Sequence, residues 1–203
     1  MVQLHSLDLT DLDTGVLPRF ETWQEHIDYL AALAAESASE DAIRAVAKAR
    51  ELLGDNVPEL PPALCHFDWH FGNVLCDKHG NLQALIDWEF AGVGDPRLDL
   101  ARFCRHECLS GASDASRRRE AGRNVEGLWN TYATARFGPE AVPAIVLGPP
   151  EPWLALESVL VLVLGSAVCH RVARCQREGT GTMDGVPRCD LVEWVFDMET
   201  AKA

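Results

Sequence analysis

A polar loop between short apolar runs is the feature that most constrains the fold of this chain. The runs Ala63–Phe67 and Val74–Cys76 enclose the loop, and a third run, Leu82–Ile86, follows across the polar turn Asp77–Asn81. Apolar runs of this length, separated by a turn that contains glycine, are typical of β-strands joined as a hairpin. The centre of the chain is therefore predicted to hold a small hairpin with a loop ahead of it.

Helices are expected on both sides of this hairpin. The segments Thr22–Glu25 and Ser37–Glu40 match the capping box that begins a helix, and apolar residues recur at helical spacing after each. Helical periodicity then returns in four segments: Leu98–Leu109, Ala115–Arg136, Trp153–Arg177 and Leu191–Thr200. The predicted fold class is mainly α with a small β-hairpin (α+β). We expect one lobe over residues 1–203, with helices over 1–57, the loop, hairpin and carboxylate segment over 63–101, and a helical part over 102–203.

The composition argues against several kinds of partner. Lys and Arg total 18 against 31 Asp and Glu, a formal net charge of −13, which repels nucleic acid and anionic membrane surfaces. Seven cysteines without a C-x-x-C pair argue against a disulfide framework and a zinc ribbon. The longest apolar run, Val159–Val168, is too short to span a bilayer. We therefore expect a cytoplasmic protein that binds neither nucleic acid nor membrane.

The loop and the hairpin carry the side chains that phosphoryl transfer needs. His66, Asp68 and Asn73 match the His-x-Asp-x4-Asn spacing of a kinase catalytic loop, and Asp87 adds a carboxylate on the far side of the hairpin. In such a loop Asp68 orients and deprotonates the attacking hydroxyl. Asn73 and Asp87 offer oxygen ligands to Mg²⁺. His66 is placed to support the loop rather than to react.

A third motif, Gly94-Asp-Pro-Arg-Leu-Asp99-Leu-Ala101, follows in order. With it, the segment from about Gln3 to Arg105 resembles the aminoglycoside phosphotransferase and choline kinase-like family. The resemblance implies the large C-terminal lobe of a protein-kinase-like fold, with Mg²⁺ and ATP or GTP as cofactors. It also implies a role for each site residue: Asp68 as catalytic base, Asn73 and Asp87 as metal ligands, and His66, His70, Asp95 and Asp99 as loop supports.

Three aromatic residues depart from the family pattern. Phe67 replaces the usual glycine, Trp69 the usual leucine and Phe71 the usual proline. None of these changes removes a functional group. Bulky rings around Asp68 would narrow the cleft for the acceptor or alter the geometry of the loop.

The N-terminal β-lobe of such an enzyme, with its nucleotide-gripping lysine, is not found in this sequence. Of the three lysines, Lys48 lies on a predicted helix only 20 residues before Asp68, which leaves no room for the intervening elements. The start, Gln3-Leu-His-Ser-Leu7, resembles the end of the helix that opens the family's large lobe. We expect very weak or no phosphotransfer from residues 1–203 alone. An apolar face near residues 1–20 and the loop would bind a missing N-lobe or a second copy.

The leading hypothesis is ATP-dependent phosphotransfer to a hydroxyl of a small, cationic acceptor, such as an aminoglycoside-like compound or an amino alcohol. One alternative is a non-catalytic kinase-like remnant or ligand-binding module. A further alternative is a zinc hydrolase that uses His66, Asp68 and His70, which alternate along an extended strand and would point to one face.

Overall fold

The computed structural model describes residues 1–10, 15, 17–37, 39–54, 57–109, 115–161 and 163. The chain divides into two compact units: Met1–Glu25 with Asp55–Leu154, and His26–Gly54 with Ala155–Ala203. The predicted helix Leu191–Thr200 and the end of the predicted helix Trp153–Arg177 lie outside the described residues. The prediction of one lobe over residues 1–203 therefore stays a prediction.

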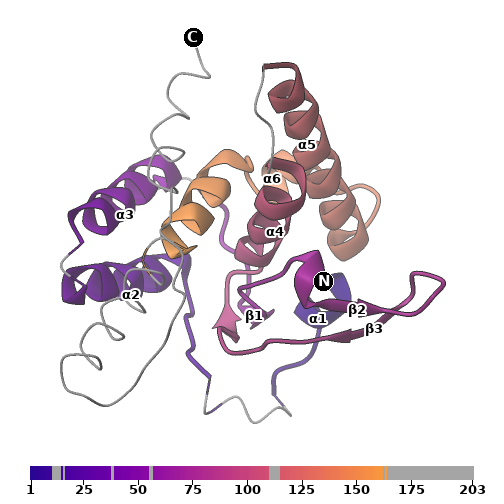
Figure 1. The fold of residues 1–203 in the computed structure, drawn as a ribbon, viewed down its shortest axis with the longest axis horizontal. Helices are drawn as coiled ribbons and strands as arrows, with labels where there is room; N and C mark the ends of the chain where they lie inside the picture. The colour runs from indigo at the N-terminus through magenta and orange to yellow at the C-terminus, as the bar shows by residue number, and fades with distance from the viewer. Residues whose placement is uncertain are drawn as a thin grey trace. The chain divides into compact units, whose positions relative to one another are not determined.

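The first unit contains the predicted hairpin and the helices around it (Figure 1). Its elements, in chain order, are α1 (Val2–His5), β1 (Ala63–Cys65), the 3₁₀ turn η1 (Phe71–Asn73), β2 (Val74–Cys76), β3 (Leu82–Leu85), β4 (Gly92–Gly94), α4 (Arg97–Cys104), the π-helical turn η2 (Arg105–Leu109), α5 (Ala115–Phe137) and α6 (Pro143–Val146). Residues 151–154 at the end of this unit are also helical, and residues 155–161, which belong to the second unit, continue as helix. The predicted fold class, mainly helical with small antiparallel sheets, is confirmed.

Strands β2 and β3 form the predicted hairpin, which projects from the body of the first unit in Figure 1. Val74 pairs with Leu85, and Leu75 pairs with Ala84. The turn is built by Asp77, whose Oδ1 accepts hydrogen bonds from the backbone N–H groups of His79 (2.8 Å) and Asn81 (2.9 Å). An aspartate that bonds its own following backbone is a common way to close such a turn.

Strands β1 and β4 form a second antiparallel pair, and a short extended segment lies along the other edge of β4. The N–H of Val93 donates to the Pro18 carbonyl, and the N–H of Phe20 donates to the Val93 carbonyl, both at 2.8 Å. Residues 18–20 thus depart from the helical prediction for 1–57. Their backbone groups bond a strand far along the chain, and the local sequence does not predict such pairing.

Gly92 lies where this three-part sheet is most crowded. A Cβ added there would lie 2.9 Å from the Pro18 carbonyl oxygen and 3.0 Å from Cε2 of Phe67. We expect Gly92→Ala to lower the free energy of unfolding by about 1–3 kcal/mol, because backbone on one side cannot yield. Gly127→Ala on α5 is the control: nothing lies within 4 Å of its added Cβ, and alanine favours the helix by about 0.5–1 kcal/mol. Denaturant unfolding measures the free energy of unfolding of both variants. A value for Gly92→Ala equal to that of wild type would contradict this packing.

The second unit contains α3 (Glu40–Leu53) and most of α2 (Trp23–Glu36). Thr22 caps the first of these helices, α2, since the Glu25 N–H donates to Thr22 Oγ1 at 3.2 Å, while the Glu25 carboxylate accepts from the N–H of Glu21 rather than from that of Thr22. At the second, Ser39 rather than Ser37 is the cap, and its Oγ accepts from the Ala42 N–H at 3.2 Å. The prediction of Ser37 is therefore wrong by two residues: Ser37 has Glu40 at the third position after it, as a capping box requires, but the helix begins after Ser39, which has Ala42 there.

His26 on α2 makes the stability of the protein depend on pH. Burial lowers its pKa from 6.5 to about 4, so the unfolded chain takes up a proton here at a higher pH than the folded chain does. Stability is therefore full above about pH 6.5 and falls as the pH drops toward 4, by about 3 kcal/mol from this group. We expect the free energy of unfolding of His26→Gln to depend less on pH between these values. The exposed-site variant His79→Gln should keep the wild-type dependence, and denaturant unfolding at several pH values measures both.

No helix in the described part of the chain is long and apolar enough to cross a membrane.

Candidate active site

Asp99, on α4, holds the start of the His66–Asn73 loop. Its buried carboxylate accepts hydrogen bonds from the N–H of His66 (2.9 Å to Oδ2) and from the N–H of Phe67 (2.6 Å to Oδ1). His5 of α1 approaches the same carboxylate, with Nε2 3.0 Å from Oδ2, and its Nδ1 lies 2.7 Å from the Tyr132 hydroxyl. Asp99 of α4 thus bonds the backbone just before Asp68, and His5 of α1 and Tyr132 of α5 extend the same hydrogen-bond network.

Phe67 adopts a backbone conformation that is rare for a bulky side chain. Its φ of +58° lies in the left-handed region, which glycine enters without strain. The bond from its N–H to Asp99 and the burial of its ring hold this conformation in place. The left-handed backbone gives a physical reason for the glycine usual in the family pattern. Strained residues of this kind concentrate at active sites.

Asp68 is held on both of its carboxylate oxygens. Oδ1 accepts from Nε of Arg102 at 2.9 Å and from Nη2 at 2.6 Å, and Oδ2 accepts from Nδ2 of Asn73 at 3.1 Å. The Asn73 amide also donates to the backbone carbonyl of Asp68, at 3.0 Å. Both of these bonds use Nδ2, and the Oδ1 of Asn73 is the oxygen that could bind a metal ion.

Asp87 is brought next to Asn73 by the hairpin register. The N–H of Ile86 donates to the Asn73 carbonyl at 2.9 Å, and Asp87 follows directly. His66, which is fully buried, fixes the same point from behind, because its Nε2 bonds the Ile86 carbonyl at 2.9 Å. Asp87 has a φ of +66° and an exposed side chain. The backbone of the two residues is thus adjacent, and carboxylate and amide oxygens are ligands that Mg²⁺ accepts.

His70 and η2 shape the other side of the loop. The Nδ1 of His70 accepts from the Gly72 N–H at 3.0 Å, and its ring stacks on His106 of η2 with centroids 4.5 Å apart. Glu107 accepts from the Phe71 N–H at 3.0 Å. π-Helical turns are frequent at functional sites, and this one places a hydrogen bond and a ring stack against the loop that carries Asp68.

Asp95, also predicted as a loop support, is not brought to the loop by its hydrogen bonds. Its carboxylate accepts from the N–H and Nε of Arg97, both at 2.9 Å, and from Nη2 at 2.5 Å. Arg97 is fully buried, donates to the Leu147 carbonyl at 3.0 Å and lies over the Trp153 ring, 3.9 Å from its centroid. The hydrogen bonds of Asp95 are thus made to the start of α4, and its role as a loop support stays a prediction.

Neither candidate zinc set is arranged as a metal site. His66 uses both ring nitrogens, one for the Ile86 carbonyl and one for the Asp68 N–H at 3.3 Å, so the predicted set of His66, Asp68 and His70 lacks a ligand. Within the described residues, His5, Cys65 and Asp99 also come within 4.8 Å of one another. Burial raises the pKa of the Cys65 thiol well above its usual value, and the thiol bonds the Gly94 carbonyl. His5 and Asp99 bond each other, and the Cys65 thiol bonds backbone carbonyls instead of facing them as a thiolate ligand.

Sequence reasoning missed the partners that come from other elements. Arg102 lies three residues after Asp99 on one helical face, and that spacing could have placed it at the loop. His5 is a polar residue that the structure buries at the end of α1, and the sequence resemblance around it predicts no role for its side chain. Glu107 lies in the helical segment after Arg105, where acidic side chains are candidates to face the acceptor, but the sequence alone does not orient them.

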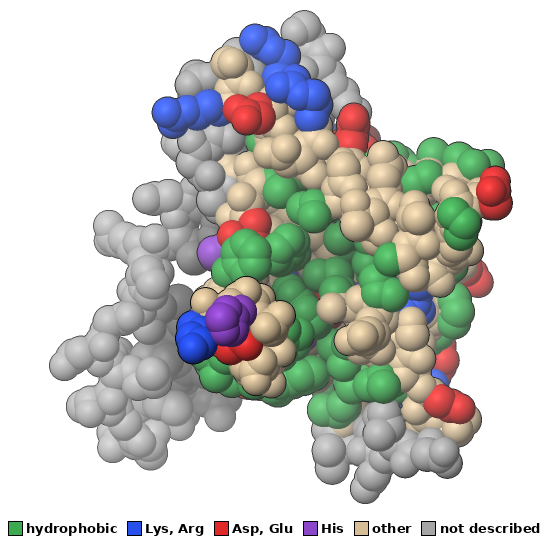
Figure 2. All heavy atoms as spheres, turned by 90° about the vertical axis from the view of Figure 1, so that its right-hand side faces the viewer, with side chains coloured by type: hydrophobic (Ala, Val, Ile, Leu, Met, Phe, Trp, Pro, Cys, Tyr) green, Lys and Arg blue, Asp and Glu red, His purple; other side chains and the backbone are tan. Residues whose placement is uncertain are grey.

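Large apolar side chains are exposed along the loop and the hairpin. Figure 2 looks at the side from which the hairpin projects, and hydrophobic side chains gather around its polar tip. Those with the greatest exposure in this region are Phe71 (62%), Leu82 (54%), Leu75 (49%), Ile86 (41%) and Trp88 (39%). The predicted apolar face is thus present at the loop. Near the N-terminus, Leu7 is also exposed.

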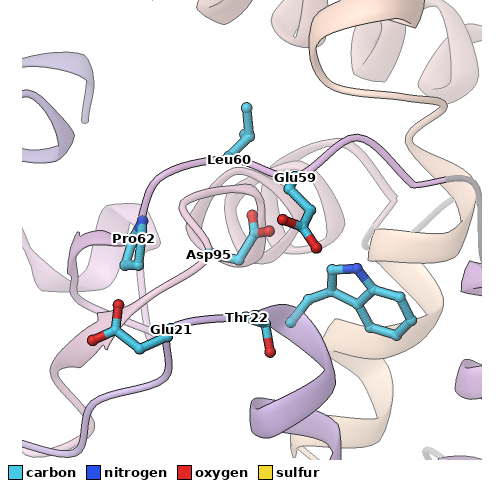
Figure 3. A pocket seen from close by; sticks show the side chains of 7 residues that line it. Glu21, Thr22, Glu59, Leu60, Pro62 and Asp95 are labelled. Carbon is cyan, nitrogen blue, oxygen red and sulfur yellow. The ribbon is translucent and has the colours of Figure 1, made fainter.

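A small pocket lies away from these residues, over Asp95 (Figure 3). It is lined by Glu21, Thr22, Trp23, Glu59, Leu60, Pro62 and Asp95. Its carboxylates come from three segments, but that of Asp95 is committed to Arg97. None of the residues of the His66–Asn73 loop lines it, so the pocket is separate from the candidate active site.

Comparisons with known proteins agree with this geometry. The family model of the phosphotransferase enzyme family matches residues 1–137. The structure resembles the crystal structure of a candidate aminoglycoside phosphotransferase from Ralstonia eutropha JMP134, with a TM-score of 0.60 and 16% identity over 96% of this chain and 57% of that one. It also resembles macrolide 2'-phosphotransferase type I, with a TM-score of 0.53 and 18% identity over 90% of this chain and 56% of that one. The chain thus spans a little over half of each. Comparison with curated proteins gives no match.

Proposed function

Because this chain belongs to the phosphotransferase enzyme family, we propose that it transfers the γ-phosphoryl group of ATP or GTP to a hydroxyl of a small molecule. The observation that supports this most is the contact between Asp68 and Asn73, a carboxylate and an amide joined at 3.1 Å, with Asp87 beside Asn73 across the hairpin. One loop and one strand end thereby offer a base and two oxygen ligands.

The proposed roles follow from this arrangement. Asp68 accepts the hydrogen bond of the acceptor hydroxyl and takes its proton as the new O–P bond forms and the bond to the leaving nucleoside diphosphate breaks. Asn73 and Asp87 would hold Mg²⁺, which when bound neutralises charge on the phosphate oxygens. His66 keeps Asp87 in place by bonding the preceding carbonyl, and Asp99 keeps the loop backbone in place.

The acceptor in this proposal is an alcohol that also carries an amine. The net charge of −13 attracts cationic molecules, and the two similar structures are named for aminoglycosides and macrolides. A cytoplasmic location belongs to the proposal, since the cytoplasm supplies nucleotide and Mg²⁺. It also suits the free cysteines of the described residues, Cys65, Cys76, Cys104 and Cys108.

Transfer of a radiolabelled γ-phosphate from Mg-ATP or Mg-GTP to aminoglycosides, macrolides, amino alcohols and sugars tests the proposal. Protein is used in excess over nucleotide, because we expect slow transfer: Lys48 pairs with Glu51 on α3 and Lys78 lies in the hairpin turn. Transfer should stop when EDTA removes the metal and fall at least about tenfold in Asp87→Asn. Transfer that is unaffected by EDTA, or the absence of both binding and transfer, contradicts the proposal.

A second candidate is a module that binds Mg-nucleotide without transferring phosphate. The positions of Lys48 and Lys78 favour it, because neither lies on a strand that could grip the phosphates. Calorimetry with Mg-ATP separates the two candidates. Binding together with label transfer supports the enzyme, and binding without transfer supports the module.

A further inference from the structure

Arg102 occupies one side of the carboxylate proposed as the base. Its Nε and Nη2 both donate to Oδ1 of Asp68, and the two side chains are only 14% and 16% exposed. Hydrogen bonds between ionised groups are short and strong, and a guanidinium presents its donors in a rigid fork. Asp68 is therefore held in one orientation from one side.

The remaining capacity of Asp68 can be counted. A carboxylate offers about four lone-pair positions, two on each oxygen. The two donors of Arg102 fill both positions on Oδ1, while Oδ2 accepts one bond, from Nδ2 of Asn73. The Nε2 of His70 is 3.6 Å from Oδ2, which is too long for a hydrogen bond. Among the partners that the structure describes, Oδ2 thus keeps one position for an incoming hydroxyl.

We propose that Arg102 is a positioning residue for phosphotransfer: it fixes Asp68 through Oδ1, so that Oδ2 is the oxygen that receives the acceptor hydroxyl and its proton. This proposal rests on the function proposed above. In the step itself, the acceptor oxygen bonds phosphorus, the bond to the nucleoside diphosphate breaks with its electron pair, and the proton moves to Oδ2. Arg102 keeps its bonds to Oδ1 throughout.

The fold explains how one helix can do this. Asp99 and Arg102 are three residues apart on α4 and share a face. Asp99 bonds the backbone N–H groups of His66 and Phe67, and Arg102 bonds the side chain of the next residue, Asp68. A single turn of α4 therefore sets both the path of the loop and the direction of its carboxylate.

The alternative is an ion pair that only ties α4 to the loop. An ion pair with that role would change the melting temperature and leave kcat of the folded protein unchanged. A positioning residue predicts a different result, because misplacing a reacting group by about 1 Å costs about a hundredfold in rate. The Michaelis constant for the nucleotide should stay the same, since Arg102 does not contact Asn73 or Asp87 in any of its described bonds.

The experiment measures kcat and KM for Mg-ATP in wild type, Arg102→Ala, Arg102→Lys and the control Arg123→Ala, which removes an exposed arginine from α5. We expect kcat to fall about a hundredfold in Arg102→Ala with KM unchanged, and about tenfold in Arg102→Lys, which keeps the charge but not the fork. Added guanidinium ion should restore part of kcat in Arg102→Ala only. Melting temperatures are recorded throughout, and if Arg102→Ala does not fold, Arg102→Lys carries the test.

The outcomes separate this proposal from the function on which it rests. If wild type transfers label and Arg102→Ala has the kcat of Arg123→Ala, the positioning role is overturned while the phosphotransfer stands. A rise in KM at constant kcat, or a loss of kcat that neither guanidinium nor Arg102→Lys relieves, also overturns it. If wild type transfers no label to any acceptor, the proposed function fails first and the positioning role fails with it.

Discussion

Asp68→Asn is expected to lower phosphotransfer by about 10²–10⁴-fold, the usual contribution of a positioned general base. The amide keeps the size of the side chain and can still accept from Asn73, but it cannot take the proton of the acceptor hydroxyl. The amide has a single oxygen, so it can accept from Asn73 or from Arg102 but not from both, and the largely buried ion pair with Arg102 is lost. The measurement is label transfer from Mg-ATP under the same protein excess as for wild type.

A matched control separates loss of the base from loss of the fold. Asp28→Asn makes the same chemical change at an exposed residue of α2, where the carboxylate pairs with Arg50. It should keep wild-type transfer. Asp68→Asn should in addition melt somewhat lower because the ion pair between Asp68 and Arg102 is lost, yet remain folded by circular dichroism. Wild-type transfer in a folded Asp68→Asn protein would remove Asp68 from the role of base.

The parts of the site that lie on one continuous stretch are the parts that the sequence predicts. Asp68 and Asn73 share a loop, and Asp87 follows a strand whose register is set by a short turn, so spacing alone brings them together. Arg102 and His5 come from helices. A helical side chain can meet any of several neighbours, and tertiary packing decides which.

The same division applies to the fold. The helices and the β2–β3 hairpin are local, and their apolar spacing and turn chemistry predict them. The pairing of residues 18–20 with β4 joins distant segments and leaves no local mark. Phe67 is a further case: the family pattern marks its position as one for glycine, but only the observed φ of +58° shows that the chain keeps the left-handed turn with a bulky residue in it.

Asp99→Ala is expected to have the largest effect on stability. It leaves the buried N–H groups of His66 and Phe67 without an acceptor, at about 1–3 kcal/mol each, and removes the partner of His5 Nε2. We expect the free energy of unfolding to fall by about 3–5 kcal/mol, as when one member of a buried charged group is deleted. Asp99→Asn should fall between wild type and alanine, because its oxygen satisfies one N–H while its amide opposes the other.

Asp99→Ala should also lower phosphotransfer by the molecules that remain folded. This loss of transfer tests the role of Asp99 more sharply than the loss of stability does. Without the bond from its N–H to Asp99, Phe67 has less reason to keep its left-handed backbone, and relaxation there would turn Asp68 away from Asn73. Transfer per folded molecule should therefore drop with Asp99→Ala even at low temperature, where most of the protein is folded. Asp28→Ala, at an exposed position, should alter neither quantity by much. An Asp99→Ala protein that is destabilised yet transfers normally when folded would show that the loop holds its shape without α4.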